Sequence, residues 1–222
     1  MRKVIAGAFV SLDGVMQAPG GPEEDPTGGF KHGGWTVPYF DEAVGQAMGE
    51  TFSRPFDLLL GRKTYEIFAA HWPYAEGGPD DFIARLFNKA TKYVATTSSA
   101  PLTWTPSVAI HEPATDVARL KRQDGPDLLI QGSSVLIQTL LENDLIDQMN
   151  LLVFPLVLGS GKRFFGDGAK AMAVSLESSK TSPSGVTINR YTPAGSVTTG
   201  SFALQTPTEA ELVRREKMKQ EV

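Results

Sequence analysis

Two glycine junctions constrain the fold of this chain more than any other feature. Each has a short apolar run, then a glycine, then small or basic polar residues, then an amphipathic stretch: DLLLGRKTYEIF at 57–68 and DLLIQGSSVLIQTLL at 127–141. That order predicts a buried strand, a tight turn and the start of a helix. A helix start has unpaired N–H groups and a positive dipole end, which suit a phosphate or pyrophosphate. Two such turns at one sheet edge would hold a dinucleotide.

The residues that follow each glycine favour anion binding. The first junction supplies two cations and a hydroxyl, and the second supplies two hydroxyls beside a position where no side chain blocks close approach. The residues are Gly61, Arg62, Lys63 and Thr64 in the first junction, and Gly132, Ser133 and Ser134 in the second. Similar turns occur in α/β proteins that bind nothing, so the motif alone is a hypothesis.

Length and composition narrow the class of protein. The chain has 222 residues, which suits one domain, expected over 1–193, followed by a tail over 194–222. The net charge of −4 argues against a nucleic-acid surface. There are no cysteines, and the three histidines have no metal-ligand spacing, so we predict neither disulfides nor a metal site. No stretch is long and apolar enough to cross a membrane, and we expect a cytoplasmic protein.

Strands alternate with helices along most of the chain, and a hairpin follows. Strands are expected at 4–10, 57–60, 92–96, 108–110, 128–131 and 148–155, and the hairpin at 173–179 and 186–191. Helices are expected at 38–52, 63–70, 79–89, 116–122 (capped by Thr115) and 134–142. This alternation predicts an α/β fold with flanking helices and a mostly parallel mixed sheet whose edge is an antiparallel C-terminal hairpin. The Gly- and Pro-rich segment 11–34 is long for a connection, as lids and binding loops often are.

The tail differs in character from the rest. Residues 194–207 are small and polar apart from a brief apolar patch at 202–204. A charged helix follows, with Thr208 and Glu211 spaced as a capping box. Two interpretations stay open: a solvated, frayed terminus, or an arm that packs on a partner subunit.

One stretch resembles a known family. It is LIDQMNLLVFPLVLGSGKRFF at 145–165, in which Asp147, Pro155, Gly159, Gly161 and Phe165 fit the pattern of a strand that runs into a G-x-G segment. The opening FVSLDGV and the GRKTYE and QGSS junctions fit as well. Together they resemble the dihydrofolate reductase superfamily. The resemblance is greatest to the branch with the C-terminal reductase domain of bacterial riboflavin biosynthesis enzymes, and it covers residues 1–192.

The resemblance implies a dihydrofolate reductase-like three-layer fold and an NADPH-dependent reductase whose cofactor lies over the carboxyl ends of the central strands. Arg62 or Lys63 would meet the 2′-phosphate, with Thr97 and Ser98 nearby. The second junction would hold the pyrophosphate. The cofactor-binding residues implied are Ala6, Val10, Gly61, Arg62, Lys63, Thr64, Thr97, Ser98, Gln131, Gly132, Ser133 and Ser134. Of these, Ala6 and Val10 would lie by the nicotinamide.

The substrate side departs from dihydrofolate reductases proper. Their helix carboxylate falls on Phe40 here, and Asp41 stands one residue later, about 100° around a helix. Asp41 takes that role only if the helix start shifts; otherwise it stabilises the helix dipole. Asp13 and Asp41 are the catalytic candidates, and Trp35, Phe40 and Phe154 the substrate-binding ones. The expected substrate is a small heterocycle, either aminopyrimidine-ribityl or pterin-like.

Two functions and one assembly remain as expectations. The first function is NADPH-dependent reduction, and the alternative is a nucleotide-binding protein without turnover, either a sensor or a degenerate paralogue. The resemblance also implies a homodimer. The apolar run 151–158 leads into Gly159, Gly161 and two phenylalanines, a segment that a lone domain would have to cover.

Overall fold

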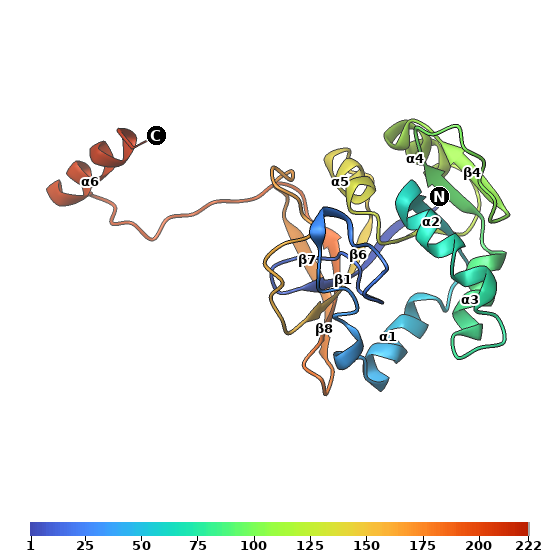
Figure 1. Ribbon diagram of the computed structural model, residues 1–222. Coiled ribbons are helices and arrows are strands. Elements are labelled where there is room, and N and C mark those ends of the chain that lie inside the picture. The colour runs from blue at the N-terminus through green and yellow to red at the C-terminus, as the bar shows by residue number, and fades with distance from the viewer. Residues whose placement is uncertain (222) are drawn as a thin grey trace.

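A sheet forms the centre of the protein (Figure 1). It has eight strands in the order β4-β3-β2-β5-β1-β6-β8-β7. The computed structural model describes residues 1–221. The strands are β1 (Val4–Ser11), β2 (Phe56–Gly61), β3 (Lys92–Ala95), β4 (Ser107–Ile110), β5 (Asp127–Gln131), β6 (Gln148–Phe154), β7 (Val174–Thr181) and β8 (Thr187–Pro193). Strands β1 to β6 are parallel, whereas β8 is antiparallel to β6 and to β7. The predicted mixed sheet with a C-terminal antiparallel hairpin is confirmed.

Helices cover both faces of the sheet, which gives three layers. The helices of these layers are α1 (Glu42–Thr51), α2 (Arg62–Ala69), α3 (Asp81–Lys89), α4 (Pro113–Lys121) and α5 (Ser134–Glu142); a further helix, α6 (Glu209–Lys219), lies apart from the sheet (Figure 1). Side chains alternate along each strand, so one strand supplies both cores. In β2, Leu58 and Leu60 pack with residues of α2 and α3, whereas Leu59 belongs to the core that α4 and α5 line. No helix among residues 1–221 is long and apolar enough to span a membrane.

Two helices begin three or more residues away from the start that the sequence pattern suggests. Helix α1 begins at Glu42 rather than 38, because Asp41 is its N-cap and the carboxylate accepts from the N–H of Val44 at 3.0 Å. The prediction that Thr115 caps α4 is wrong. That helix begins at Pro113, whose fixed φ and missing N–H suit the first helical position.

The long connection after β1 is an ordered part of the body. Val15 is fully buried and forms an isolated antiparallel bridge with Arg163, while Phe30 and Trp35 pack with Val15 in a third apolar cluster. The segment that follows β6 therefore lies against this connection. Together they form the wall beside the carboxyl end of β1.

The chain beyond β8 leaves the body. Ala194 and Gly195 still pair with Ala173, after which the chain extends to α6, well away from the sheet (Figure 1). The predicted cap is confirmed, because the Thr208 hydroxyl accepts from the N–H of Glu211. The Glu211 carboxylate accepts from arginines of its own helix instead of from the Thr208 amide. Only one of the two hydrogen bonds of a capping box is therefore formed.

Candidate functional site

The two glycine junctions meet at the carboxyl ends of neighbouring strands. β2 and β5 are adjacent and parallel, and their following helices cover opposite faces of the sheet. Ligands of open α/β sheets bind where the connections diverge in this way, in the crevice outside the carboxyl ends. The fold therefore places its switch point between Gly61 and Gln131, the last residues of these two strands.

A single hydroxyl joins the junctions. The Ser133 Oγ accepts from the N–H of Gly61 at 2.8 Å and donates to the Thr64 Oγ1 at 2.9 Å. Ser133 has a left-handed backbone (φ 70°, ψ 62°) and follows Gly132 at φ 81°. A Cβ on Gly132 would lie 3.3 Å from the Thr64 methyl carbon. Glycine therefore suits this position for two reasons: it tolerates the positive φ, and it leaves room for Thr64. Four of the predicted residues thus form one contact group.

The backbone donors at both helix starts have no side-chain cap. Gly61 is the N-cap of α2 and Ser133 that of α5, and neither helix has a capping side-chain hydrogen bond. The first N–H groups of a helix need acceptors from somewhere. At this crevice, they are available to an anionic ligand.

The predicted 2′-phosphate residues lie on neighbouring segments. The Arg62 side chain donates to Glu66 at 2.6 Å and to the Ala100 carbonyl oxygen at 2.9 Å. This contact joins the start of α2 to the loop that carries Thr97 and Ser98. The two segments expected to share a phosphate are therefore connected before any ligand binds.

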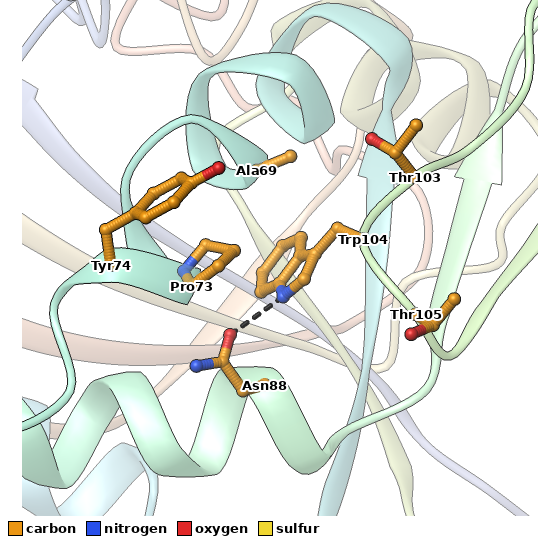
Figure 2. Close-up of a pocket in the computed structure, with 7 residues that line it drawn as sticks. All are labelled: Ala69, Pro73, Tyr74, Asn88, Thr103, Trp104 and Thr105. Carbon is orange, nitrogen blue, oxygen red and sulfur yellow. Dashed lines mark hydrogen bonds between the residues drawn. The ribbon is translucent and has the colours of Figure 1, made fainter.

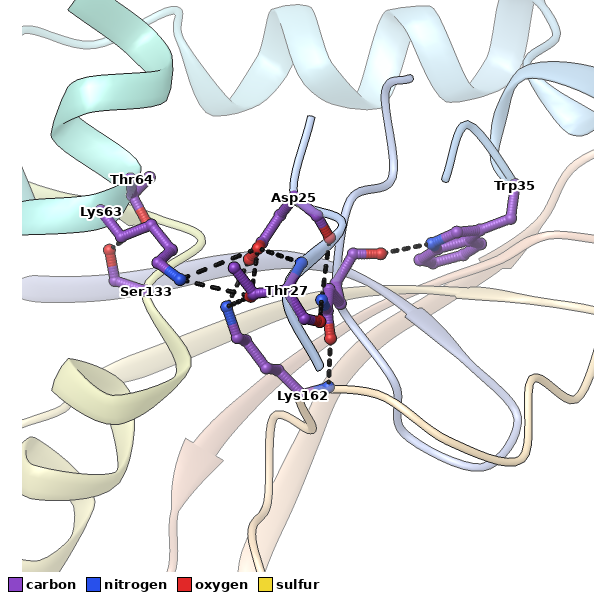
Figure 3. A network of polar contacts seen from close by, with 8 residues as sticks. Asp25, Thr27, Trp35, Lys63, Thr64, Ser133 and Lys162 are labelled. Carbon is purple, nitrogen blue, oxygen red and sulfur yellow. Dashed lines mark hydrogen bonds and ion pairs between the residues drawn. The ribbon is translucent and has the colours of Figure 1, made fainter. Parts of the chain in front are cut away.

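Lys63 points to the long connection and not to Arg62. Its Nζ lies 3.2 Å from the Thr27 hydroxyl and 3.9 Å from the Asp25 carboxylate (Figure 3). Lys162 binds the same carboxylate and lies 3.0 Å from the same hydroxyl. Burial of Asp25 opposes ionisation, but hydrogen bonds from Lys162 and Thr27 outweigh it, so the pKa of Asp25 is lowered. Two cations share one buried carboxylate at the mouth of the crevice.

Gln17 fixes the loop that presents this carboxylate. Its Nε2 donates to the carbonyl oxygens of Asp25 and Thr27, both at 2.8 Å, and its Oε1 accepts from the N–H of Lys162 at 3.0 Å. The Trp35 indole donates to the Gln17 carbonyl oxygen at 2.8 Å (Figure 3). Sequence reasoning missed Gln17, Asp25, Thr27 and Lys162, because partners 135–145 residues apart carry no local signal.

The three residues predicted to bind substrate differ in exposure. Phe40 is 50% exposed and stands edge-on to Phe9. Trp35 is buried, and its ring meets Phe154 edge-on at 5.3 Å between centroids. Phe154 has no exposed surface, because Phe9, Trp35 and Tyr39 surround it. In this conformation Phe154 supports the pocket wall, and Phe40 alone of the three offers a large face to a ligand.

The residues expected by the nicotinamide lie in the core and on the central strand. Ala6 and Val10 are buried in the cluster that α4 and α5 line. Gln131 instead covers β1. A Cβ built on Gly7 would stand 2.5 Å from the Gln131 Nε2, so only glycine at 7 leaves room for that carboxamide. The sequence did not single out Gly7.

Asp13 and Asp41 each accept several structural hydrogen bonds. The Ser11 hydroxyl bond, followed by N–H bonds from Leu158 and Gly159, lowers the pKa of Asp13 to about 2.

At Asp41, the Val44 and Ser184 N–H bonds lower the pKa to about 2. Both groups are therefore carboxylates at neutral pH, and their catalytic assignment stays a prediction.

A separate pocket of about 380 Å³ lies by the amino ends of β3 and β4 (Figure 2). The Trp104 indole forms one wall and donates to the Asn88 Oδ1 at 2.7 Å. Behind it, the Lys92 ammonium lies 4.2 Å from the Trp104 ring centroid and donates to carbonyl oxygens of α3, while burial lowers the pKa of Lys92 to about 8. These contacts hold α3 to the sheet at the end opposite the crevice.

Known proteins resemble this chain over most of its length. The family model described as the RibD C-terminal domain matches residues 2–188. The uncharacterised protein YyaP of Bacillus subtilis is 26% identical over 189 residues, which cover 83% of this chain and 92% of YyaP. YwjB of the same organism is 26% identical over 186 residues, covering 81% of this chain and 91% of YwjB.

Two solved structures share the fold. A putative riboflavin biosynthesis protein from Shewanella sp. PV-4 has a TM-score of 0.54 at 20% identity, covering 86% of this chain and 99% of that one. A pyrimidine reductase-like protein from Corynebacterium diphtheriae has a TM-score of 0.54 at 13% identity, covering 87% and 92%. The dihydrofolate reductase-like architecture expected from the sequence is confirmed.

Among residues 1–221, no group of three or more His, Asp or Glu side chains is placed to hold a metal ion. The polar groups at the crevice are instead hydroxyls, backbone amides and lysines. That chemistry suits phosphate oxygens.

Proposed function

Because the chain belongs to the RibD C-terminal domain family, we propose that it is an NADPH-dependent reductase of a small heterocyclic substrate. One observation carries the proposal: the Ser133 hydroxyl bonds to Gly61 and Thr64, so two uncapped helix starts face one crevice at the switch point. A dinucleotide has two phosphate regions that need such donors.

We assign the parts of the cofactor to three sets of residues. Gly132, Ser133 and Ser134 hold the pyrophosphate, where glycine permits close approach and α5 supplies N–H groups. The 2′-phosphate lies against Arg62 and the loop of Thr97 and Ser98, which the Ala100 contact already joins. Lys63 supplies a second cation from the other side of the α2 start, since its side chain is half exposed.

The nicotinamide end lies on β1, on the side of Gly7 and Gln131. The bound nicotinamide cofactor supplies the hydride. The protein places the acceptor, keeps water out and holds the ring in position. The ordered connection 11–34, held by Gln17 and Asp25, forms the wall that excludes water. Ala6 and Val10 support β1 from the core beneath it.

The substrate lies between α1 and this wall, beside the exposed Phe40 ring. We propose an aminopyrimidine-ribityl or pterin-like heterocycle, because a flat ring can stack on that aromatic face. With pKa values of about 2, Asp13 and Asp41 hold no proton at neutral pH. A proton that the reduction consumes then comes from a donor other than these two carboxyl groups.

The alternative function is nucleotide binding without turnover. The same carboxylates support it, because neither Asp13 nor Asp41 carries a proton that it could donate at neutral pH. NADPH oxidation, measured against a panel of pterins, aminopyrimidines and imines, separates the two functions. Oxidation that depends on one of these acceptors supports the reductase. Tight NADPH binding with no acceptor across the panel favours the alternative, and no NADPH binding contradicts both.

A further inference from the structure

The C-terminal arm, residues 196–221, is a folded but unattached part of the chain. Its residues are exposed throughout apart from partial burial at Pro207 and Glu211. Phe202 is fully exposed and Leu204 is 70% exposed. Helix α6 has only 11 residues, and an isolated helix of that length is marginal in water unless it packs on something. The arm therefore has both the apolar residues and the need for a surface.

The outer edge of β7 is an uncovered surface that, like the arm, carries exposed apolar side chains. β7 is the last strand of the sheet, and all eight of its residues are exposed. Val174 and Leu176 share one face and are 42% and 55% exposed. A long edge with exposed apolar residues invites pairing with another chain. Among the described residues, no strand pairs with this edge.

The register of β7 limits where a further strand can pair. Its pairing with β8 shifts between Leu176 and Ser178, so the regular stretch at this end is 174–176. In the arm, Phe202 and Leu204 are two residues apart and would share one face of a strand. The segment 202–204 therefore matches the segment 174–176 in length, and each has large apolar side chains at its first and third residues.

We propose that residues 202–204 add as a strand to the β7 edge of a second copy of this chain. Strand addition draws its affinity from main-chain hydrogen bonds and its register from alternate side chains. The last residue tied to the arm's own body is Gly195, and the seven residues to Phe202 reach about 23–25 Å when extended. Figure 1 shows the arm extended away from its own sheet, which is the direction in which a neighbouring copy would lie. The exchange is mutual in a two-fold dimer. It is independent of the reductase proposal.

Disulfide trapping tests the pairing, because the natural chain has no cysteine. One preparation carries Leu176→Cys and the other Leu204→Cys; both side chains are exposed, so folding tolerates the changes. The two are mixed, incubated to allow exchange and oxidised. We expect a covalent dimer of twice 24.0 kDa. The matched control replaces Leu176→Cys by Val108→Cys, because Val108 is 46% exposed on β4, the opposite edge of the sheet.

Two further readouts complete the test. A single chain with both cysteines must give the disulfide between chains rather than within one, as peptide mapping of mixed isotope-labelled protein shows. In the cysteine-free full chain, trypsin must cleave after Arg214 and Arg215 more slowly than in Phe202→Asp/Leu204→Asp. Equal dimer yields with the Val108 control, a disulfide confined within one chain, or equal cleavage of both proteins overturns the proposal.

Discussion

The Ser133 hydroxyl accepts a hydrogen bond from the N–H of Gly61 at 2.8 Å, and so it ties the end of β2 to the start of α5. These residues are 72 positions apart in the chain. The same hydroxyl donates to the Thr64 Oγ1 at 2.9 Å, so Ser133 makes two hydrogen bonds to the first junction. The proposed cofactor site depends on this contact.

Removal of that hydroxyl tests the site. In Ser133→Ala, the Gly61 N–H and the Thr64 hydroxyl lose a partner, and a lost partner of this kind costs about 1–3 kcal/mol. We expect weaker NADPH binding by calorimetry, about 5- to 150-fold. Thr139→Ala is the control, because it removes from the same helix a partly exposed hydroxyl that contacts neither junction and donates to the Val135 carbonyl oxygen. Similar affinities for the two variants contradict the assignment.

Cofactor choice follows from the cations near the start of α2. NADPH should bind more tightly than NADH, because charged hydrogen bonds to the 2′-phosphate contribute about 1.5–3 kcal/mol each. Arg62→Ala with Lys63→Ala should remove most of this preference in titration calorimetry. Arg85→Ala is the control, since Arg85 is an exposed cation on α3. Equal NADPH and NADH affinity in the unmodified protein excludes a 2′-phosphate site here.

Asp41 should contribute to stability in a pH-dependent way. Hydrogen bonds in the folded state lower its pKa from 3.8 to about 2, so its stabilising effect is present above the unfolded pKa and is lost as pH falls from about 4 to about 2. Asp41→Asn should therefore be less stable than the parent near neutral pH, and the gap should close in acid. Urea unfolding across that range measures it. Asp80→Asn is a matched control, because Asp80 is an N-cap without a capping bond.

Dihydrofolate should be a weak substrate or none. Phe40 stands where the acid is expected, and the neighbouring Asp41 carboxylate binds Val44 and Ser184. General acid–base assistance is typically worth about 10²- to 10⁴-fold in rate. Steady-state NADPH oxidation with dihydrofolate gives the answer. If turnover is efficient and Asp41→Asn abolishes it, the carboxylate supplies the proton in a rearranged site.

Gly7 should matter to the site more than to the fold. A Cβ there meets the flexible end of the Gln131 side chain, which can move at little cost. Gly7→Ala should therefore shift the carboxamide and weaken NADPH binding with little change in melting temperature. Gly7→Ala combined with Gln131→Ala relieves the contact. Two results together would show that the carboxamide has no role in NADPH binding. Gly7→Ala would bind NADPH as tightly as the parent, and the double variant would bind NADPH no better than Gln131→Ala alone.

Local patterns predicted the parts of the fold that local chemistry decides. The pattern at the second junction predicted α5 with the bounds that the structure has, because a glycine, two serines and an apolar stretch define a helix start. Thr208 was predicted as a cap for the same reason. The error at α4 is also local: the sequence pattern predicts Thr115 as the cap, whereas the helix already begins at Pro113.

Only about half of the candidate site could be predicted from the sequence. The hydroxyls and amides of the junctions follow from motifs, whereas Asp25 and Lys162 meet because the segment after β6 returns to the connection after β1. A pairing across 137 residues is decided by sheet order, which periodicity does not reveal. The burial of Phe154 has the same origin, since three aromatic rings enclose it, one from β1 and two from the connection before α1.

The central position of β1 has a consequence for how the protein forms. Val4 pairs with Leu128, and Ile5 pairs with Gln148, so β1 leaves the ribosome before its partner strands, which are made more than a hundred residues later. Until then its apolar side chains have no sheet to join. Pairings of this kind are slow, because a long loop must close before the contact forms. We expect the nascent chain to rely on chaperones until β5 and β6 have emerged, and the crevice to be among the last features assembled.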